Sequence, residues 1–273
     1  DAEVLTLDEP TAVLTPRETD ELLAIMRQLC DDGKSVVFIS HKLREVKAVS
    51  DVITVIRRGK VVGDAPPSAS TTELASMMVG RSVSLNLNKA PAEPGANTFS
   101  IRDLVVRSDT GQAVVDHVSL DIAKGEILAV AGVQGNGQTE LTEAIMGLQS
   151  HVTGSIMLDG NELVGRRVEQ VIEAGVGFVP EDRSVDGLVG TFTVAENLIL
   201  NRYKKPPFAR GLSMRPAVVA ANAAEKIGEF DIRTQSAEAA AGTLSGGNQQ
   251  KVVMARELSR PLSLFIASQP TRG

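Results

Sequence analysis

Residues 5–11 read Leu-Thr-Leu-Asp-Glu-Pro-Thr, and residues 265–271 read Phe-Ile-Ala-Ser-Gln-Pro-Thr. The two stretches align without gaps, with Ser268 opposite Asp8 and Gln269 opposite Glu9, at a constant offset of 260 residues. Repetition at this distance indicates that the chain runs from inside one domain to the corresponding point of a second, related domain. The first copy ends its apolar strand with two carboxylates, which can hold a metal ion and polarise a water molecule. The second copy has neutral side chains there, so we expect the chemistry in the first copy.

The composition is that of a folded globular protein with about two domains. The chain has 273 residues, of which 42% are hydrophobic and 23% charged, and its net charge of −6 argues against a broad nucleic-acid surface. Its single cysteine excludes an internal disulfide and fits a reducing cytosol. No apolar run reaches the roughly 18 residues needed to span a bilayer. We therefore expect no direct membrane insertion, so that any membrane association depends on a partner.

The amino-terminal part predicts a strand–helix–strand unit. Apolar residues predict buried strands at residues 4–7 and 35–39, and a further strand is expected at residues 52–56. Thr15 and Glu18 form a capping-box pattern around Pro16, which predicts the start of the intervening helix. Two parallel strands place their carboxyl ends at one edge of a sheet, where open α/β sheets bind ligands. Asp8, Glu9 and His41 follow those ends and are expected to lie together.

Residues 82–98 lose periodicity and gain proline, glycine and asparagine, which is typical of a linker. We therefore divide the chain into residues 1–81, a linker at 82–98, and a second domain at 99–273. The pattern of the second domain predicts antiparallel strands at 100–106 and 114–122, then a buried strand at 126–131 and a helix ending near Gly147. Residues 180–242 are expected to be mainly helical, with a helix at about 217–230. We also expect a helix at 245–259 and a strand at 262–267 at the end of the second domain.

Residues 132–139, Gly-Val-Gln-Gly-Asn-Gly-Gln-Thr, have the frame of a phosphate-binding loop, Gly-x4-Gly-Lys-Ser/Thr, with Gln138 in place of lysine. Glycines allow successive backbone N–H groups to face a phosphate at a helix N-terminus. Thr139 is a candidate Mg²⁺ ligand. The alternative is an ordinary glycine turn between a strand and a helix. The candidate phosphate-binding residues are Gly132, Gly135, Asn136, Gly137, Gln138 and Thr139.

Residues 244–251, Leu-Ser-Gly-Gly-Asn-Gln-Gln-Lys, form the sharpest local motif. A serine N-cap followed by two glycines exposes N–H groups at a helix start, which suits a terminal phosphate. A plain helix cap would need the serine but not both glycines. The candidate nucleotide-binding residues of this motif are Ser245, Gly246, Gly247 and Gln249.

With these ordered motifs the chain resembles the ABC transporter ATPases over nearly its whole length outside the linker. The resemblance implies an α/β fold of the P-loop NTPase type, in which a mixed sheet is joined to an antiparallel and a helical subdomain, present here as two incomplete copies. It implies ATP and Mg²⁺ as ligands. On this resemblance Asp8 acts on Mg²⁺, Glu9 is the catalytic base and His41 is the histidine that contacts the γ-phosphate.

In this family two nucleotide-binding domains pair head to tail around each ATP. The resemblance therefore implies one consensus site, where Asp8, Glu9 and His41 face the Ser245–Gly247 motif across the same nucleotide. Its phosphate loop would lie upstream of Asp1, so we expect the 273-residue chain alone to be inactive. The other site has Gln138, Ser268 and Gln269 and is degenerate, because loss of a general base alone typically costs about 10²- to 10⁴-fold in rate.

Three further departures from the family pattern stand out. No aromatic residue occupies the stretch near Arg107 where the family stacks adenine, which leaves the adenine contact unassigned. Glu181 stands where most relatives carry a glutamine that senses Mg²⁺ and the permease. Thr15 replaces an acidic residue after the carboxylate pair.

Within the family, the pattern is similar to the twin-domain ATPases of bacterial simple-sugar and nucleoside importers. The stretches at residues 180–183, 186–188 and 196–198 resemble that subfamily, and residues 11–16, 135–141 and 267–273 resemble its nucleoside branch. This implies membrane permease subunits and a solute-binding protein as partners, no nucleic acid, and a place on the cytoplasmic face of the membrane. Two alternatives remain: a soluble twin-domain ABC ATPase acting on ribosomes, and a regulatory ATP-binding module without turnover.

Overall fold

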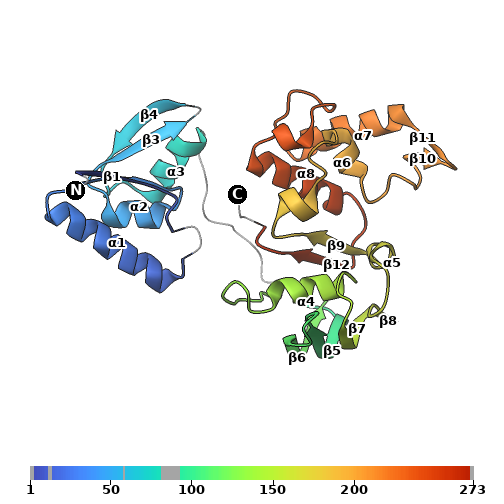
Figure 1. Ribbon diagram of the computed structural model, residues 1–273. Helices are drawn as coiled ribbons and strands as arrows, with labels where there is room; N and C mark the ends of the chain where they lie inside the picture. Colours follow the sequence, from blue (N-terminus) through green and yellow to red (C-terminus); the bar gives the residue numbers. More distant parts are fainter. Residues whose placement is uncertain (1–2, 12–13, 58, 81–92, 271–273) are drawn as a thin grey trace. The chain divides into compact units, whose positions relative to one another are not determined.

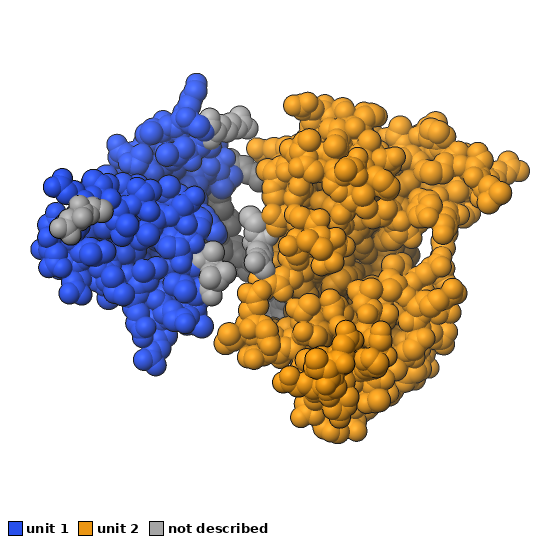
Figure 2. All heavy atoms as spheres, viewed as in Figure 1, with its two compact units in different colours: residues 1–91 blue, residues 92–273 orange. Residues whose placement is uncertain are grey.

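The structure, a computed structural model, describes residues 3–11, 14–57, 59–80 and 93–270. The chain divides into two compact units, Asp1–Pro91 and Ala92–Gly273, which Figure 2 colours blue and orange. Most of the expected linker, residues 82–92, lies outside the described residues, and the first strand of unit 2 already begins at Asn97. Within the described part of the chain, no helix is both long and apolar enough to cross a membrane.

Unit 1 alternates strands and helices along the chain (Figure 1). Its elements are β1 (Val4–Asp8), α1 (Pro16–Asp31), β2 (Ser35–Ile39), α2 (Leu43–Val49), β3 (Ile53–Arg57), β4 (Lys60–Ala65) and α3 (Thr71–Val79). β1 pairs with β2 in parallel, with Asp8 opposite Ile39, whereas β3 and β4 form an antiparallel pair. The parallel pair confirms the strand–helix–strand unit.

Helix α1 begins where the capping pattern predicts. The backbone N–H of Glu18 donates to Thr15 Oγ1 at 3.3 Å, and Thr15 N–H donates to the Glu18 carboxylate at 2.8 Å. These bonds satisfy donors that the first helical turn leaves unpaired, and Pro16 has no N–H to satisfy. The helix ends before Gly33, whose φ of +79° is strained for residues with a side chain.

The expectation that strands 4–7 and 35–39 are buried was wrong. Val4 and Val37 are 59% and 50% exposed, because β1 and β2 have no third strand beside them among the described residues. The core of unit 1 lies instead between the β3–β4 pair and helices α2 and α3, where Leu74 is fully buried.

Unit 2 carries more elements, all drawn in Figure 1 from green to red. They are β5 (Asn97–Arg107), β6 (Ala113–Ala123), α4 (Gln138–Ile145), β7 (Val152–Leu158), β8 (Asn161–Glu162), α5 (Val168–Glu173), β9 (Val176–Val179), the π-helix η1 (Arg183–Gly187), α6 (Val194–Ile199), β10 (Ala209–Arg210), β11 (Ser213–Met214), α7 (Pro216–Glu229), the 3₁₀-helix η2 (Ala241–Thr243), α8 (Gly246–Leu258) and β12 (Leu264–Ala267).

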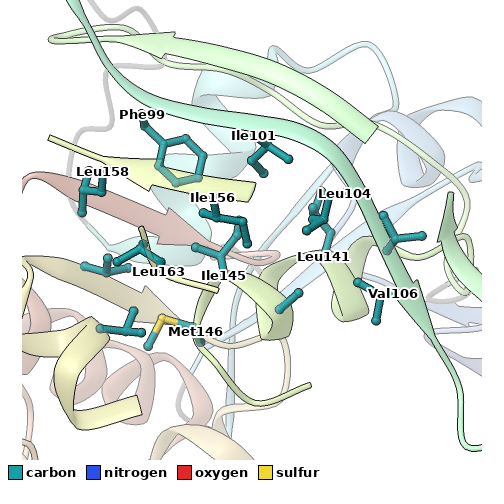
Figure 3. Packing of buried hydrophobic residues seen from close by; sticks show 14 residues of the cluster. Phe99, Ile101, Leu104, Val106, Leu141, Ile145, Met146, Ile156, Leu158 and Leu163 are labelled. Carbon is teal, nitrogen blue, oxygen red and sulfur yellow. The ribbon is translucent and has the colours of Figure 1, made fainter. Parts of the chain in front are cut away.

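An antiparallel sheet and a parallel strand pair form the lower part of unit 2 in Figure 1. The sheet has the strand order β6-β5-β7-β8, which confirms the antiparallel strands expected at 100–106 and 114–122. β12 pairs in parallel with β9. Figure 3 shows the core that joins these parts: Ile101, Leu104 and Ile156 from the sheet pack beside Leu141 and Ile145 of α4. This packing holds α4, and with it the preceding glycine-rich loop, against the sheet.

The buried strand expected at 126–131 is absent. These residues form no strand, and Ile127 and Val130 are 77% and 59% exposed. An apolar run becomes a strand only where a neighbouring strand can pair with its backbone groups. No described strand pairs with this segment, so the glycine-rich loop follows an irregular stretch.

Helices are the main regular elements between residues 180 and 242, but turns and irregular segments take up more than half of this region, so the expectation is only partly met. Thr193 and Glu196 form the expected capping box at the start of α6, and α7 covers almost the whole of the expected helix at 217–230. Between α6 and α7, however, β10 and β11 form a short antiparallel hairpin that the sequence pattern does not predict. Side chains of α6, α7 and α8 pack into a second core, in which Leu198, Ala223 and Val252 are buried.

Candidate nucleotide-binding sites

Glu9 lies directly after the carboxyl end of β1 in a backbone conformation that is uncommon for a residue with a side chain. Its φ is +45°, and its N–H donates to the carbonyl oxygen of Ile39 at 2.9 Å. The bond extends the parallel β1–β2 ladder by one residue, and the positive φ turns the chain at its end. Asp8 precedes it on the strand and is exposed.

The side chain of Glu9 is held by His41, as expected from the sheet edge. His41 Nδ1 lies 2.8 Å from Glu9 Oε1, and the backbone N–H of His41 donates to the same oxygen at 3.1 Å. The second carboxylate oxygen, Oε2, is buried and has no hydrogen-bond partner among the described residues. Burying a carboxylate oxygen costs folding free energy unless a water, an ion or a substrate supplies the missing hydrogen bond or contact. One oxygen of Glu9 is thus anchored, and the other is buried without a hydrogen-bond partner among the described residues.

A polar network that the sequence motifs do not predict fixes the turn after Glu9. Thr11 is fully buried, and its hydroxyl donates to Glu45 Oε2 at 2.6 Å. Lys42 Nζ donates to the carbonyl oxygen of Thr11 at 2.8 Å and forms an ion pair with Glu45 at 3.4 Å. Because Thr11 and Lys42 each follow closely after a site residue, this network holds the Glu9 turn against the His41 turn. In the sequence Glu45 is one acidic residue on a short helix, and its distance along the chain from Thr11 does not predict this network.

Unit 2 repeats the backbone of this turn with neutral side chains. Gln269, the counterpart of Glu9, also has a φ of +45°. The strand pairing differs, because here Ser268, the counterpart of Asp8, donates its N–H to the carbonyl oxygen of Val179 at 2.9 Å. The positive φ is therefore what the two strand ends share. Gln269 uses it to donate from Nε2 to Glu181 Oε1 at 2.9 Å.

The glycine-rich loop of unit 2 is completed by its own glutamine. Gln138 Nε2 donates to the carbonyl oxygen of Val133 at 3.0 Å, and Gln138 Oε1 accepts the backbone N–H of Asn136 at 3.1 Å. Lysine has donors but no acceptor, so it could not make the second bond. The amide oxygen takes a loop N–H that a phosphate oxygen would otherwise accept. Gly137, at the start of α4, has a φ of +93° and lies against the backbone of Val114, where a Cβ would clash.

Glu181 gathers the remaining polar side chains of this loop region. Its carboxylate accepts from Gln134 Nε2 at 3.0 Å and, more weakly, from Thr139 Oγ1 at 3.4 Å, besides the bond from Gln269. In the sequence Glu181 stands out only as a departure from the family pattern. In the structure it is the residue that brings the glycine-rich loop and the strand end together.

These residues line one cavity of about 490 Å³ in unit 2. Its polar end is formed by the glycine-rich loop, Glu181, Ser268 and Gln269, and its apolar part by the sheet, α4 and β12. The volume lies in the range of small-molecule sites. Four of the candidate phosphate-binding residues line it, namely Gly132, Gly135, Gln138 and Thr139. Asn136 and Gly137 belong to the same loop.

The Ser245–Gly247 motif does not line this cavity. Ser245 is the N-cap of α8, and its hydroxyl accepts Asn248 Nδ2 at 2.9 Å instead of a backbone N–H. Gly247 has open space where a Cβ would be, and Gln249 Nε2 donates to the carbonyl oxygen of Ala241 at 3.3 Å. None of Ser245, Gly246, Gly247 and Gln249 lines the cavity. Gln249 therefore supports the turn before the motif in this structure.

The residues fit a Mg²⁺ ion differently in the two units. In unit 1 the exposed carboxylate of Asp8 at the strand end has oxygen atoms of the kind that Mg²⁺ prefers. In unit 2 Thr139 has a hydroxyl, but the strand end offers only Ser268 and Gln269. Across the described residues no cluster of three or more acidic, histidine or cysteine side chains could by itself hold a metal ion. Binding would thus depend on phosphate and water oxygens as well.

The two remaining histidines, His117 and His151, lie on the surface of unit 2. His117 Nδ1 lies 2.6 Å from Asp103 Oδ1, and this hydrogen bond raises the pKa of His117. His151 is also exposed. Among the described residues, the side-chain partners of both histidines are aspartates outside the candidate sites.

Comparisons with known proteins show the family to which the chain belongs. A family model described as ABC transporter matches residues 115–272. The chain is 48% identical over 273 residues to the nucleoside import ATP-binding protein NupA of Lactococcus lactis subsp. cremoris, covering 100% of this chain and 54% of the relative. It is 42% identical to the guanosine import ATP-binding protein NupO of Bacillus subtilis, with the same coverage, and 39% identical to a ribose import ATP-binding protein of Streptomyces avermitilis, of which it covers 51%. The chain thus spans about half the length of these curated relatives.

Solved structures agree on the fold. A dimeric post-hydrolysis state of an ATP-binding cassette bound to ADP and Pi superposes with a TM-score of 0.53 at 23% identity, covering 63% of this chain and 74% of that one. A nucleotide-free ATP-binding cassette gives a TM-score of 0.51 at 20% identity, covering 64% and 69%. The expected α/β fold of the P-loop type is confirmed by these neighbours.

Proposed function

Because this chain belongs to the ABC transporter ATPase family, we propose that it is part of the ATP-binding and ATP-hydrolysing subunit of an importer. The proposal includes a single hydrolytic site in the whole protein, with its carboxylates supplied by unit 1. The observation that carries it is the contrast at the two strand ends. Glu9 and Gln269 share a φ of +45°, but only Glu9 has a carboxylate, with a histidine on one oxygen and a buried second oxygen that has no hydrogen-bond partner among the described residues.

The geometry of Glu9 suits a general base. His41 and its backbone N–H hold Oε1, which fixes the direction of the carboxylate. Oε2 is then the atom that would accept the proton of the attacking water. Mg²⁺, when bound near Asp8, would neutralise charge on the phosphates and orient them. Because a carboxylate only accepts, the contact with Glu9 places a proton on His41 Nδ1. The other nitrogen, Nε2, would donate to a γ-phosphate oxygen only in the imidazolium form, in which both nitrogens carry protons.

The second site is proposed to bind nucleotide without efficient turnover. Its loop lacks the lysine, and the amide of Gln138 already satisfies a loop N–H. Its strand end lacks both carboxylates. The Ser245–Gly247 motif of unit 2 would complete the consensus site across the ATP in the paired domains, as in the family.

The transported solute is proposed to be a nucleoside. The relative with 48% identity is named for nucleoside import and another for guanosine import, whereas the ribose importer is 39% identical. The partners would be membrane permease subunits and a solute-binding protein, with the subunit on the cytoplasmic face of the membrane. The relatives are import proteins, so they give no support to the ribosomal alternative.

The experiment uses the complete subunit, reconstituted with its permease and solute-binding protein in vesicles. We expect phosphate release from ATP to be stimulated by a nucleoside such as guanosine and not by ribose. Stimulation by ribose alone would contradict the nucleoside assignment but would still support an importer. The absence of ATP hydrolysis under all conditions would contradict the proposed function itself.

A further inference from the structure

Unit 2 contains a segment whose charge is opposite to that of the chain as a whole. Residues 197–224 include no aspartate or glutamate, in a chain whose net charge is −6. We call this stretch the basic segment. Its cationic residues are Arg202, Lys204, Lys205, Arg210 and Arg215. The segment covers the end of α6, the β10–β11 hairpin and most of α7.

The hairpin within the basic segment is anchored at its base and bare at its tip. Phe208 is buried in the helical core, with the guanidinium of Arg202 5.2 Å from its ring centre. Ala209 then pairs with Met214, and the turn between the strands consists of Gly211 and Leu212. In Figure 1 the hairpin projects from the edge of unit 2 beyond α7. A rigid base thus presents a two-residue turn outward.

The outward side chains combine apolar and cationic groups. Leu212 is 108% exposed relative to its reference value, and Met214 is 45% exposed. Lys204, Arg210 and Arg215 are exposed as well. The guanidinium of Arg202 instead stacks on the ring of Phe208, and Lys205 forms an ion pair with Glu173. A fully exposed leucine beside arginines is typical of segments that lie on a membrane surface, where the leucine enters the headgroup region.

Charge complementarity distinguishes between the surfaces available to such a segment. The cytoplasmic loops of membrane proteins are enriched in lysine and arginine, and these loops would repel the three exposed cations. Anionic lipid headgroups would attract them, and each cation near such a surface strengthens binding about five-fold. The observations therefore favour lipid over a basic protein surface.

We propose that the β10–β11 hairpin of unit 2 binds the surface of a membrane that contains anionic lipids. Lys204, Arg210 and Arg215 contact the phosphate groups, and Leu212 lies among the headgroups. The contact rests on the surface and does not span the bilayer. It is independent of ATP hydrolysis and of the identity of the transported solute.

The test is sedimentation of the full 273-residue chain with lipid vesicles. We expect binding to vesicles of phosphatidylglycerol and phosphatidylcholine in equal parts, no binding to pure phosphatidylcholine, and a loss of binding at high salt. Lys204→Glu combined with Arg210→Glu should weaken binding about 30-fold or more. Leu212→Asp should weaken it about ten-fold, since the apolar contact is lost.

A matched control separates this site from a general charge effect. Lys60→Glu combined with Lys124→Glu changes the net charge equally at two exposed lysines outside the basic segment. This pair should bind vesicles like the parent chain. Equal losses from both pairs, or equal binding to neutral vesicles, would overturn the proposal. Failure of the parent chain to bind anionic vesicles would also overturn it and favour an acidic protein surface as the partner of the hairpin.

Discussion

The imidazole of His41 contacts the carboxylate of Glu9, with Nδ1 2.8 Å from Oε1. The two residues are 32 positions apart and meet because β1 and β2 are parallel neighbours. The contact orients both groups at once: it anchors Oε1 of Glu9, while Oε2 has no hydrogen-bond partner among the described residues. We therefore expect the pair to function as a unit.

Replacing His41 tests this unit. In the complete reconstituted subunit, His41→Ala should lower the rate of ATP hydrolysis by about 10²-fold or more, because Glu9 loses its orientation and the phosphate loses a contact. Nucleotide binding, followed with a fluorescent ATP analogue, should change much less. His151→Ala, at an exposed histidine of unit 2, serves as the control. Unaltered turnover in His41→Ala would contradict a role for the pair.

The buried bond between Thr11 and Glu45 is expected to stabilise unit 1. Thr11→Val keeps the shape but leaves a buried carboxylate oxygen without its donor, which costs about 1–3 kcal/mol of unfolding free energy. The loss can be measured by hydrogen exchange in peptides from residues 14–57 at increasing urea concentration. Thr110→Val, at an exposed threonine of unit 2, should leave that exchange unchanged. A loss below the error of the measurement would mean that the network does not hold the Glu9 turn.

Gln138 provides a test of the glycine-rich loop that uses the 273-residue chain. Gln138→Lys removes the acceptor that satisfies Asn136 N–H and adds a charged donor, so affinity for ATP should rise about 2- to 30-fold. Titration with a fluorescent nucleotide measures it. Gln112→Lys adds the same charge at an exposed position of the same unit and should have little effect. Equal affinities of the parent chain and Gln138→Lys would contradict the view that the glutamine weakens this loop.

The parts of the fold that sequence predicted well were those set by local chemistry. Capping boxes at Thr15 and Thr193 placed two helix starts, and alternation predicted β5 and β6. The contact of Glu9 with His41 also followed, because parallel strands bring their carboxyl ends together. The failures depended on distant partners. Residues 126–131 have the apolar run of a strand but no described neighbour to pair with, and β1 and β2 lie exposed for the same reason.

The polar details of the sites could not be predicted from motifs. The Thr11–Glu45 bond joins residues 34 positions apart, and the Glu181–Gln269 bond joins residues 88 positions apart. Such contacts depend on side-chain direction in the folded chain, which spacing along the sequence does not encode. The two hydrogen bonds between the Gln138 side chain and its own loop likewise depend on the rotamer of Gln138.

The most direct measurement compares two matched substitutions in the complete subunit with its permease: Glu9→Gln and Gln269→Glu. Each exchanges an amide and a carboxylate at the same backbone turn, in opposite directions. Phosphate release should fall by about 10²- to 10⁴-fold in Glu9→Gln, with ATP still bound, and should change little in Gln269→Glu. Undiminished hydrolysis in Glu9→Gln, or equal losses in both variants, would contradict a single hydrolytic site supplied by unit 1.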